Sequence, residues 1–284
     1  MRFEPGIPMK ARVNRYFKYV LLGTLLCAGT VDAMADDSTS PAAPDTASPD
    51  AWHFTVGSGL FSLPKYPGAS DRRFEPLPLL GASNGRYFIG TVPDAGIPLG
   101  LGVYLYRDSH WQVAALLSYD FIQPRDQSDD ARLQGLGDIP RTAHAGLFGS
   151  YTLDWFSVHG SVLTDILGKH EGTVATLGVE GKYQPVDRLT LSAGPGLTWG
   201  SSQYDRTFYG VDAGQSARSG LPEYEPDAGV ASVNFSVKAN YRLSNRWGVG
   251  ATVVASELRG DVGGSPIVEK KTQVTYGVFS SYRF

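Results

Sequence analysis

The side chains in this sequence that could carry acid–base chemistry are its histidines and the carboxylates that share a strand face with them. A histidine beside a carboxylate can act as a general acid or base. One hypothesis is therefore a hydrolase built on His144, His159 and Asp165, with His159 as the main candidate. A ladder of polar side chains that hydrates or fills an interior is the simpler interpretation, and we favour it. By two-residue alternation, seven ionisable residues fall on the polar faces of predicted strands: Asp120, His144, His159, Asp165, Glu180, Lys182 and Lys238.

Other catalytic and metal-binding patterns are missing from the sequence. The single cysteine, Cys27, lies in an N-terminal apolar run, so thiol chemistry is excluded from an exported chain. The sequence contains no Gly-x-Ser-x-Gly elbow. The aspartates between Asp126 and Asp138 lack the spacing of a calcium loop. We therefore expect no enzyme activity, no metal site and no cofactor.

The N-terminus is typical of a cleaved export signal. Basic residues between Lys10 and Lys18 precede a short apolar run at residues 19–30, and Ala33-Met34-Ala35 fits a cleavage site. We expect residues 1–35 to be removed, whether translation starts at Met1 or Met9. Lipidation is not expected, because a large residue, leucine, precedes the cysteine.

The segment after the predicted cleavage site differs in composition from the rest of the chain. Residues 36–51 are acidic, rich in Pro, Ala and Ser and poor in large apolar side chains, which predicts a disordered linker. Residues 52–284 form the predicted folded domain. The formal net charge of −3 argues against nucleic acid as a partner, because such proteins carry a basic footprint.

The folded part is dominated by strict two-residue alternation, which predicts strands. In residues 231–241 the apolar side chains alternate with polar ones without a break, and residues 247–256 repeat the pattern. The apolar set of the first strand is Ala231, Val233, Phe235, Val237, Ala239 and Tyr241. Residues 111–121 and 189–199 follow the same rule.

Two folds produce such strands, a soluble sandwich and a membrane barrel, and three features favour the barrel. Aromatic residues sit at the ends of the apolar faces, as in the interfacial girdles of outer-membrane barrels. The opposite faces carry Gly, Ser and Thr with isolated charges. The strands run about ten residues, which suits a tilted membrane strand. Outside the N-terminus, no apolar run approaches the roughly 18 residues of a membrane helix.

The connections alternate between short turns and longer loops, as expected for periplasmic turns and external loops. This alternation predicts about twelve strands, with ten as the alternative because Pro93 and Pro98 interrupt residues 87–106. The longer loops cover residues 64–72, 123–141, 201–227 and 259–270. The sequence does not decide whether residues 201–227 fold inward as a plug.

The C-terminal segment Val274–Phe284 ends in aromatic residues on one strand face. Tyr282 and Phe284 resemble the assembly signal of outer-membrane barrels, since a free terminal strand can pair edge-on with an assembly machine. We therefore expect export to the outer membrane of a Gram-negative cell. The expected partners there are the barrel-assembly machinery, outer-membrane lipid and lipopolysaccharide.

Several segments, taken in order, resemble the MipA/OmpV family of outer-membrane proteins. They begin with Trp52–Gly59 and Pro64–Asp71, continue through Gly135–Ile139 and Gly194–Trp199, and end with the terminal strand. Pro140 departs from the pattern we expect after Asp138-Ile139. The resemblance implies a scaffold role that holds a lytic transglycosylase and a penicillin-binding protein together. A small-solute or stress-response pore is the alternative, and an outer-membrane hydrolase is the third.

Overall fold

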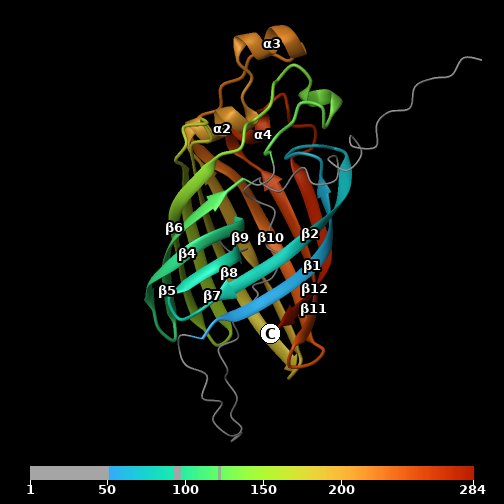
Figure 1. The fold of residues 1–284 in the computed structure, drawn as a ribbon. Helices are drawn as coiled ribbons and strands as arrows, with labels where there is room; N and C mark the ends of the chain where they lie inside the picture. Colours follow the sequence, from blue (N-terminus) through green and yellow to red (C-terminus); the bar gives the residue numbers. More distant parts are fainter. Residues whose placement is uncertain (1–50, 93–96, 121–122) are drawn as a thin grey trace, which may run out of the picture.

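The chain folds into a closed antiparallel barrel in which twelve strands pair in chain order (Figure 1). The computed structural model describes residues 51–92, 97–120 and 123–284. β1 closes the barrel against β12, with Thr55 opposite Arg283 and Ser62 opposite Tyr276. The strands are β1 (His53–Pro64), β2 (Arg72–Ser83), β3 (Tyr87–Val92), β4 (Ile97–Arg107), β5 (Trp111–Tyr119), β6 (Ala143–Leu153), β7 (Phe156–Asp165), β8 (Thr173–Val186), β9 (Leu189–Gly200), β10 (Gly229–Arg242), β11 (Trp247–Leu258) and β12 (Thr272–Arg283).

The strand count confirms the prediction of twelve, and the alternative of ten is wrong. The proline-interrupted region forms two strands, β3 and β4, with Tyr87 opposite Val103. The expected export signal at residues 1–35 lies outside the described residues, as do residues 36–50 of the expected linker. Among the described residues, no helix is long and apolar enough to cross a membrane.

The outer wall of the barrel is apolar, as the alternation predicts. Leu101, Leu147, Phe235 and Val278 each expose more than half of their surface, at 53, 55, 51 and 60%. A water-soluble sheet would bury such a face, whereas a membrane barrel presents it to lipid. Trp111, Tyr119, Tyr183, Tyr241 and Trp247 are also exposed, near strand ends. They form the aromatic girdles that the sequence predicted.

One residue of the predicted outer face lies inside. The register between β9 and β10 shifts between Val230 and Ser232, so a β-bulge turns Ala231 inward. Ala231 is 3% exposed and packs in a cluster with Tyr204 and Phe208. A bulge adds one residue without any change in composition, so simple alternation assigned Ala231 to the wrong face.

The interior is less polar than its Gly, Ser and Thr content predicted. One apolar cluster of inward side chains spans β3 to β7 and contains Phe88, Ile97, Ala114, Leu116, Phe148 and Leu163. A second, Phe61, Leu63 and Leu77 with Phe279 against it, lies inside β1, β2 and β12. Buried polar side chains line β8 to β11 and are also present on other strands, for example Glu75 on β2 and Ser161 on β7. A barrel of this size therefore fills part of its interior with packed side chains.

The long loops at one end fold together into a loop cap, defined here as residues 64–71, 123–142, 201–228 and 259–271. It contains η2 (Ala131–Leu133), α2 (Ser202–Tyr209), α3 (Ala213–Ser219) and α4 (Gly260–Gly264). Ser201 caps α2, and Asp212 and Gln215 form a capping box on α3. Figure 1 shows α2 and α4 at the barrel mouth and α3 beyond them, at the end away from the C-terminus.

Two buried clusters hold the loop cap together. One joins Tyr204, Phe208 and Tyr209 of α2 to Val262 of α4, with Ala231 and Leu258 from the strands below. The other joins Tyr66, Ala69, Leu133, Leu136, Val211 and Ile267 from four different loops. The loops thus share a core of their own, which fixes them over the mouth of the barrel.

Solvent reaches the interior mainly from the end that carries the short turns. On β5, β8, β10, β11 and β12, an inward residue nearer the loop cap is buried: Ser118, Glu180, Ser232, Thr252 and Thr275. On the same strands a residue nearer the turns is partly exposed: Gln112, Lys182, Asn240, Gly250 and Ser281. We call this second set the turn-end interior wall. Because short turns of such barrels face the periplasm, this wall opens toward the periplasm.

Candidate functional site

Apart from a pair on β2, in which Arg73 Nε lies 3.5 Å from Glu75 Oε2, the paired ionisable side chains inside the barrel form two groups on different walls. The first group is an ion pair between Lys238 of β10 and Glu180 of β8, with 2.6 Å between Nζ and Oε2. Ser192 of β9 lies between them in the sheet, directly opposite both Lys238 and Lys182. Both members of the pair are buried. A buried pair of this kind has to be kept complete, because either charge alone would lack compensation.

The second group joins one histidine to two carboxylates beneath the loop cap. His144, on β6, lies with Nδ1 3.5 Å from Oδ1 of Asp120, just after β5. Its Nε2 lies 3.3 Å from Oε2 of Glu171, in the connection between β7 and β8. All three residues are buried. We call them the His144 cluster.

Neighbouring groups hold the His144 cluster in place. The Thr142 backbone N–H donates to Oδ2 of Asp120, and its hydroxyl donates to Oδ1 of Asp165. The Glu171 backbone N–H donates to the other Asp165 oxygen. Asp165 therefore stabilises the conformation of the connection between β7 and β8 that contains Glu171. The residue before Glu171, His170, has a φ of 68°, a left-handed conformation that is uncommon outside glycine.

Burial disfavours the charged forms of both carboxylates in the His144 cluster. It raises the pKa of Asp120 to about 7, and the negative charge of Glu171 adds to this shift. Burial likewise raises the pKa of Glu171, opposed by its contact with His144. One oxygen on each carboxylate, Oδ1 of Asp120 and Oε1 of Glu171, has no hydrogen-bond partner. The negative charges of the two carboxylates are thus incompletely compensated, and each carboxylate has an oxygen to which no group donates a hydrogen bond.

The structure sorts the seven residues predicted from alternation into these groups. Asp120 and His144 meet, with Asp165 one hydrogen bond away, and Glu180 meets Lys238 with Lys182 nearby on β8. His159 lies apart, six residues along β7 from Asp165, which is roughly 20 Å of strand. Its ring lies over Gly178 of β8, where a side chain would come within 2.3 Å of Nε2.

Glu171 is the cluster member that sequence reasoning missed. It lies in a connection between strands, where two-residue alternation does not predict which way a side chain points. The hydrolase hypothesis depended on His159, yet the histidine that contacts carboxylates is His144. That histidine is 6% exposed beneath the loop cap, which leaves little room for a substrate.

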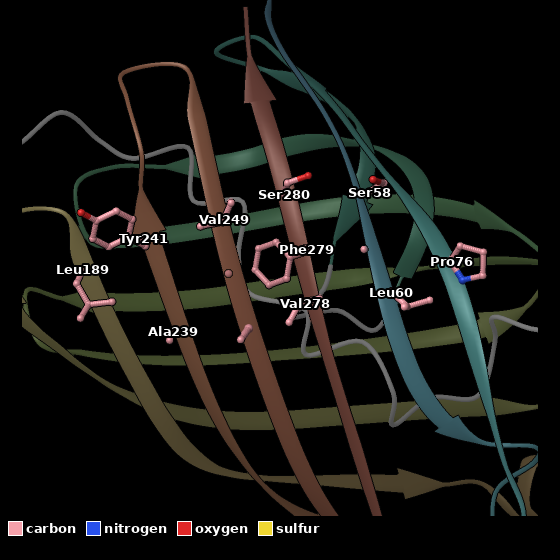
Figure 2. Close-up of a pocket in the computed structure, with 13 residues that line it drawn as sticks. Ser58, Leu60, Pro76, Leu189, Ala239, Tyr241, Val249, Val278, Phe279 and Ser280 are labelled. Atoms are coloured by element: carbon pink, nitrogen blue, oxygen red, sulfur yellow. The ribbon is translucent and has the colours of Figure 1, made fainter.

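A shallow groove in the outer wall is a third feature, but its position explains it without chemistry. Figure 2 shows it across β9 to β12, β1 and β2, where small or apolar side chains such as Leu60, Ala239 and Val278 line the wall. Alternation points these side chains away from the interior. The groove therefore belongs to the lipid-facing surface.

The predicted assembly signal lies at the edge of the same wall. Tyr282 and Phe284 contact each other edge to face at 5.0 Å between ring centroids, and Tyr282 also contacts Trp247 of β11. The Phe284 N–H donates to Phe54 O of β1, so the chain end is paired in the closed barrel. Their role in assembly stays a prediction.

The sequence and the barrel together place the chain among known proteins. Residues 56–284 match the family described as MltA-interacting protein MipA. The chain belongs to the MipA family. Among its MipA-family relatives is the "Putative outer membrane protein YiaT" of Escherichia coli K12, 26% identical over 247 residues, which are 86% of this chain and 96% of that protein. This MipA-family barrel is an outer-membrane protein.

Two further relatives carry names that describe a location or an interaction. The MltA-interacting protein of Escherichia coli K12 is 25% identical over 233 residues, 81% of this chain and 90% of that protein. OmpV of Vibrio cholerae is 25% identical over 161 residues, 56% of this chain and 61% of that protein. None of these names describes a reaction.

Two solved outer-membrane proteins align with this chain at low identity. The COG4313 outer membrane channel of Pseudomonas putida F1 aligns with a TM-score of 0.47 and 12% identity, over 86% of this chain and 100% of that one. The NanC porin aligns with a TM-score of 0.38 and 8% identity, over 82% of this chain and 99% of that one.

Proposed function

We propose that this MipA-family barrel is a non-enzymatic scaffold that binds a lytic transglycosylase at its periplasmic end. A penicillin-binding protein, also implied by the family resemblance, is the second partner we expect. The name of the MltA-interacting protein of Escherichia coli supports the first partner, since that relative aligns over 90% of its length. The observation that carries the proposal is the charge of the periplasmic rim.

The periplasmic rim is defined here as residues 84–87, 106–111, 153–156, 183–189, 242–247 and 283–284. It holds six arginines, Arg86, Arg107, Arg188, Arg242, Arg246 and Arg283, against three aspartates, Asp108, Asp154 and Asp187. Five of these arginines are exposed, and Trp155 beside them exposes 67% of its surface. Arginine and tryptophan are the residues most often found at interaction hot spots. The rim therefore suits an acidic protein surface.

Access to the interior supports a scaffold more than a pore. A small-solute pore needs a continuous polar path, but inward residues on five strands are buried toward the loop cap and partly exposed at the turn-end interior wall. Two apolar clusters also occupy much of the inner surface. The polar surface thus faces the periplasm, where murein enzymes are located.

Binding of a purified enzyme to the refolded barrel tests the proposal. The mature chain is placed in lipid nanodiscs, and the affinity of a lytic transglycosylase is measured by biolayer interferometry. The triple substitution Arg188→Glu, Arg242→Glu and Arg246→Glu is expected to weaken binding roughly tenfold or more, because each exposed charge pair contributes up to about 1 kcal/mol. The affinity is also expected to fall with added salt.

The matched control reverses three arginines at the opposite end of the molecule. Arg206, Arg218 and Arg259 lie in the loop cap and, like five of the rim arginines, are exposed. Because Arg206 and Arg218 also contact Asp227 and Gly135 of the cap, the control is used only if its cap resists protease as the parent does. The control variant is expected to bind as the parent does. Absence of binding by a correctly folded parent barrel, or equal weakening by both triple variants, would contradict the proposal.

A further inference from the structure

We propose that Asp120, His144 and Glu171 form a binding site for one divalent transition-metal ion of the Zn²⁺ class, beneath the loop cap. Each residue offers one ligand atom, and the three atoms lie within 4.8 Å of one another. This inference is independent of partner binding at the periplasmic rim.

The spacing of the three side chains suits ligands of a single ion. The imidazole of His144 lies between the two carboxylates, with Nε2 3.3 Å from Glu171 and Nδ1 3.5 Å from Asp120, and only one of these nitrogens can bind the ion. Two ligands at the usual 2.0–2.1 Å from a tetrahedral zinc lie roughly 3.3 Å apart. One nitrogen–carboxylate pair already has this spacing, and the third ligand atom, within 4.8 Å of the other two, has to move closer by a side-chain rotation. A water molecule is the usual fourth ligand.

Two buried carboxylate oxygens of the cluster make no hydrogen bond, which is a second indication of a ligand; Asp120 Oδ1 has only its 3.5 Å contact with His144. Asp120 is 0% exposed and Glu171 is 2% exposed, yet Oδ1 of the first and Oε1 of the second have no hydrogen-bond partner. Buried polar atoms without partners are rare and need an explanation such as an ion. Because the ligand set also includes His144, these are not simply crowded carboxylates.

Charge and ligand type indicate the class of ion. Two carboxylates and a neutral imidazole together balance the charge of a divalent cation. Without an ion, two carboxylates and a protonated imidazole would have a net charge of −1. Imidazole suits zinc and its neighbours, while calcium and magnesium prefer oxygen ligands alone. The mixed nitrogen and oxygen set therefore favours a transition metal.

The ion would join the barrel wall to the loop cap. Its ligands come from the end of β5, from β6 and from the connection between β7 and β8. That connection contacts α2, because the Thr207 hydroxyl donates to His170 O and the Gln203 side chain contacts the His170 ring at 3.2 Å. A bound ion would thus stabilise the outer end of the barrel, since it binds only the folded state.

Metal content and a metal-dependent spectrum test this inference. The mature barrel is refolded with EDTA, dialysed into metal-free buffer and titrated with Zn²⁺, and with Co²⁺ as a visible-absorbing probe. We expect one ion per chain and a higher unfolding temperature with Zn²⁺. Glu171→Gln and His144→Gln, which keep side-chain size, are expected to weaken binding at least tenfold and to abolish the Co²⁺ absorption band.

The control variant is His159→Ala, which removes an interior histidine outside the cluster and is expected to bind the ion as the parent does. Folding of every variant is checked by its gel mobility before and after heating. A folded parent that takes up no ion would overturn the inference and leave His144 as a protonated bridge. Uptake that is equal in the parent and in both glutamine variants would overturn it as well, because the ion would then bind elsewhere.

Discussion

At the scale of single residues, the interior of the barrel depends on charges that are paired and buried. The Lys238–Glu180 pair joins β10 to β8 inside the barrel. We predict that Glu180→Gln lowers the free energy of unfolding by about 3–5 kcal/mol, because it removes the carboxylate that compensates the charge of the buried lysine. The double variant with Lys238→Met is expected to recover most of this loss. Guanidinium unfolding in lipid vesicles measures both, and equal stability of the single and double variants would contradict the pairing.

Asp205 makes the stability of the loop cap depend on pH. Neither of its carboxylate oxygens has a hydrogen-bond partner, and burial, with a smaller effect of Asp261, raises its pKa to about 7. An unfolded aspartate has a pKa of about 3.9. The raised pKa means that the folded cap binds the extra proton, so this stabilisation is complete below about pH 4 and is lost as the pH rises through 7.

The loop cap is therefore expected to resist protease better at pH 5 than at pH 8. The slope contributed by Asp205 is at most about 1.4 kcal/mol per pH unit between the two pKa values. In Asp205→Asn, which cannot ionise, the rate of cleavage in residues 201–228 is expected to change much less over this range. A variant that keeps the full pH dependence of the parent would show that another group is responsible.

At the scale of the elements, strands were predictable and connections were not. Period-two alternation is a local property, so it located the strands, including the C-terminal strand β12. The bulge at Ala231 shifts the register by one residue without a sequence signal, and the contacts of Glu171 depend on how a connection folds. The apolar interior clusters were missed for another reason: in these strands both faces carry apolar residues, for example Phe88 beside Ile89 in β3.

The loop cap is expected to lose its packing without unfolding of the barrel. Phe208 is buried between α2 and its neighbours, with its ring 4.6 Å from that of Tyr204. We predict that Phe208→Ala loosens the cap by about 3–5 kcal/mol and speeds cleavage within residues 201–228. The barrel itself is expected to stay folded, with unchanged heat-dependent gel mobility. Loss of the whole barrel in this variant would show that cap and barrel fold as one unit.

The terminal aromatic residue of the chain, Phe284, is part of the predicted assembly signal. Removal of Phe284 is expected to slow insertion by the purified assembly machinery several-fold, because the strand loses its terminal aromatic side chain. The truncation is expected to change the stability of the finished barrel much less. Val278→Ala, on the same lipid-facing side of β12, serves as the control, and equal slowing of both variants would argue against a specific terminal signal.

At the scale of the whole molecule, the two ends of the barrel differ. The outer end is covered by loops with a shared core, and the periplasmic end presents arginines and a partly exposed interior wall. Alternation and loop lengths predicted the barrel and its long loops at one end. They did not predict the shared core of these loops, which arises from contacts between segments far apart in the sequence. The asymmetry is the reason for assigning a binding role to the periplasmic end rather than a transport role to the interior.

Single-channel conductance of the refolded barrel in a planar bilayer tests this account most directly. The loop cap and the interior clusters predict a silent barrel, with no steady openings above the noise under an applied voltage. The protein must show the heat-dependent gel mobility of a folded barrel in the same preparation. Steady openings that sugars or antibiotics block would contradict the account and make the chain a pore.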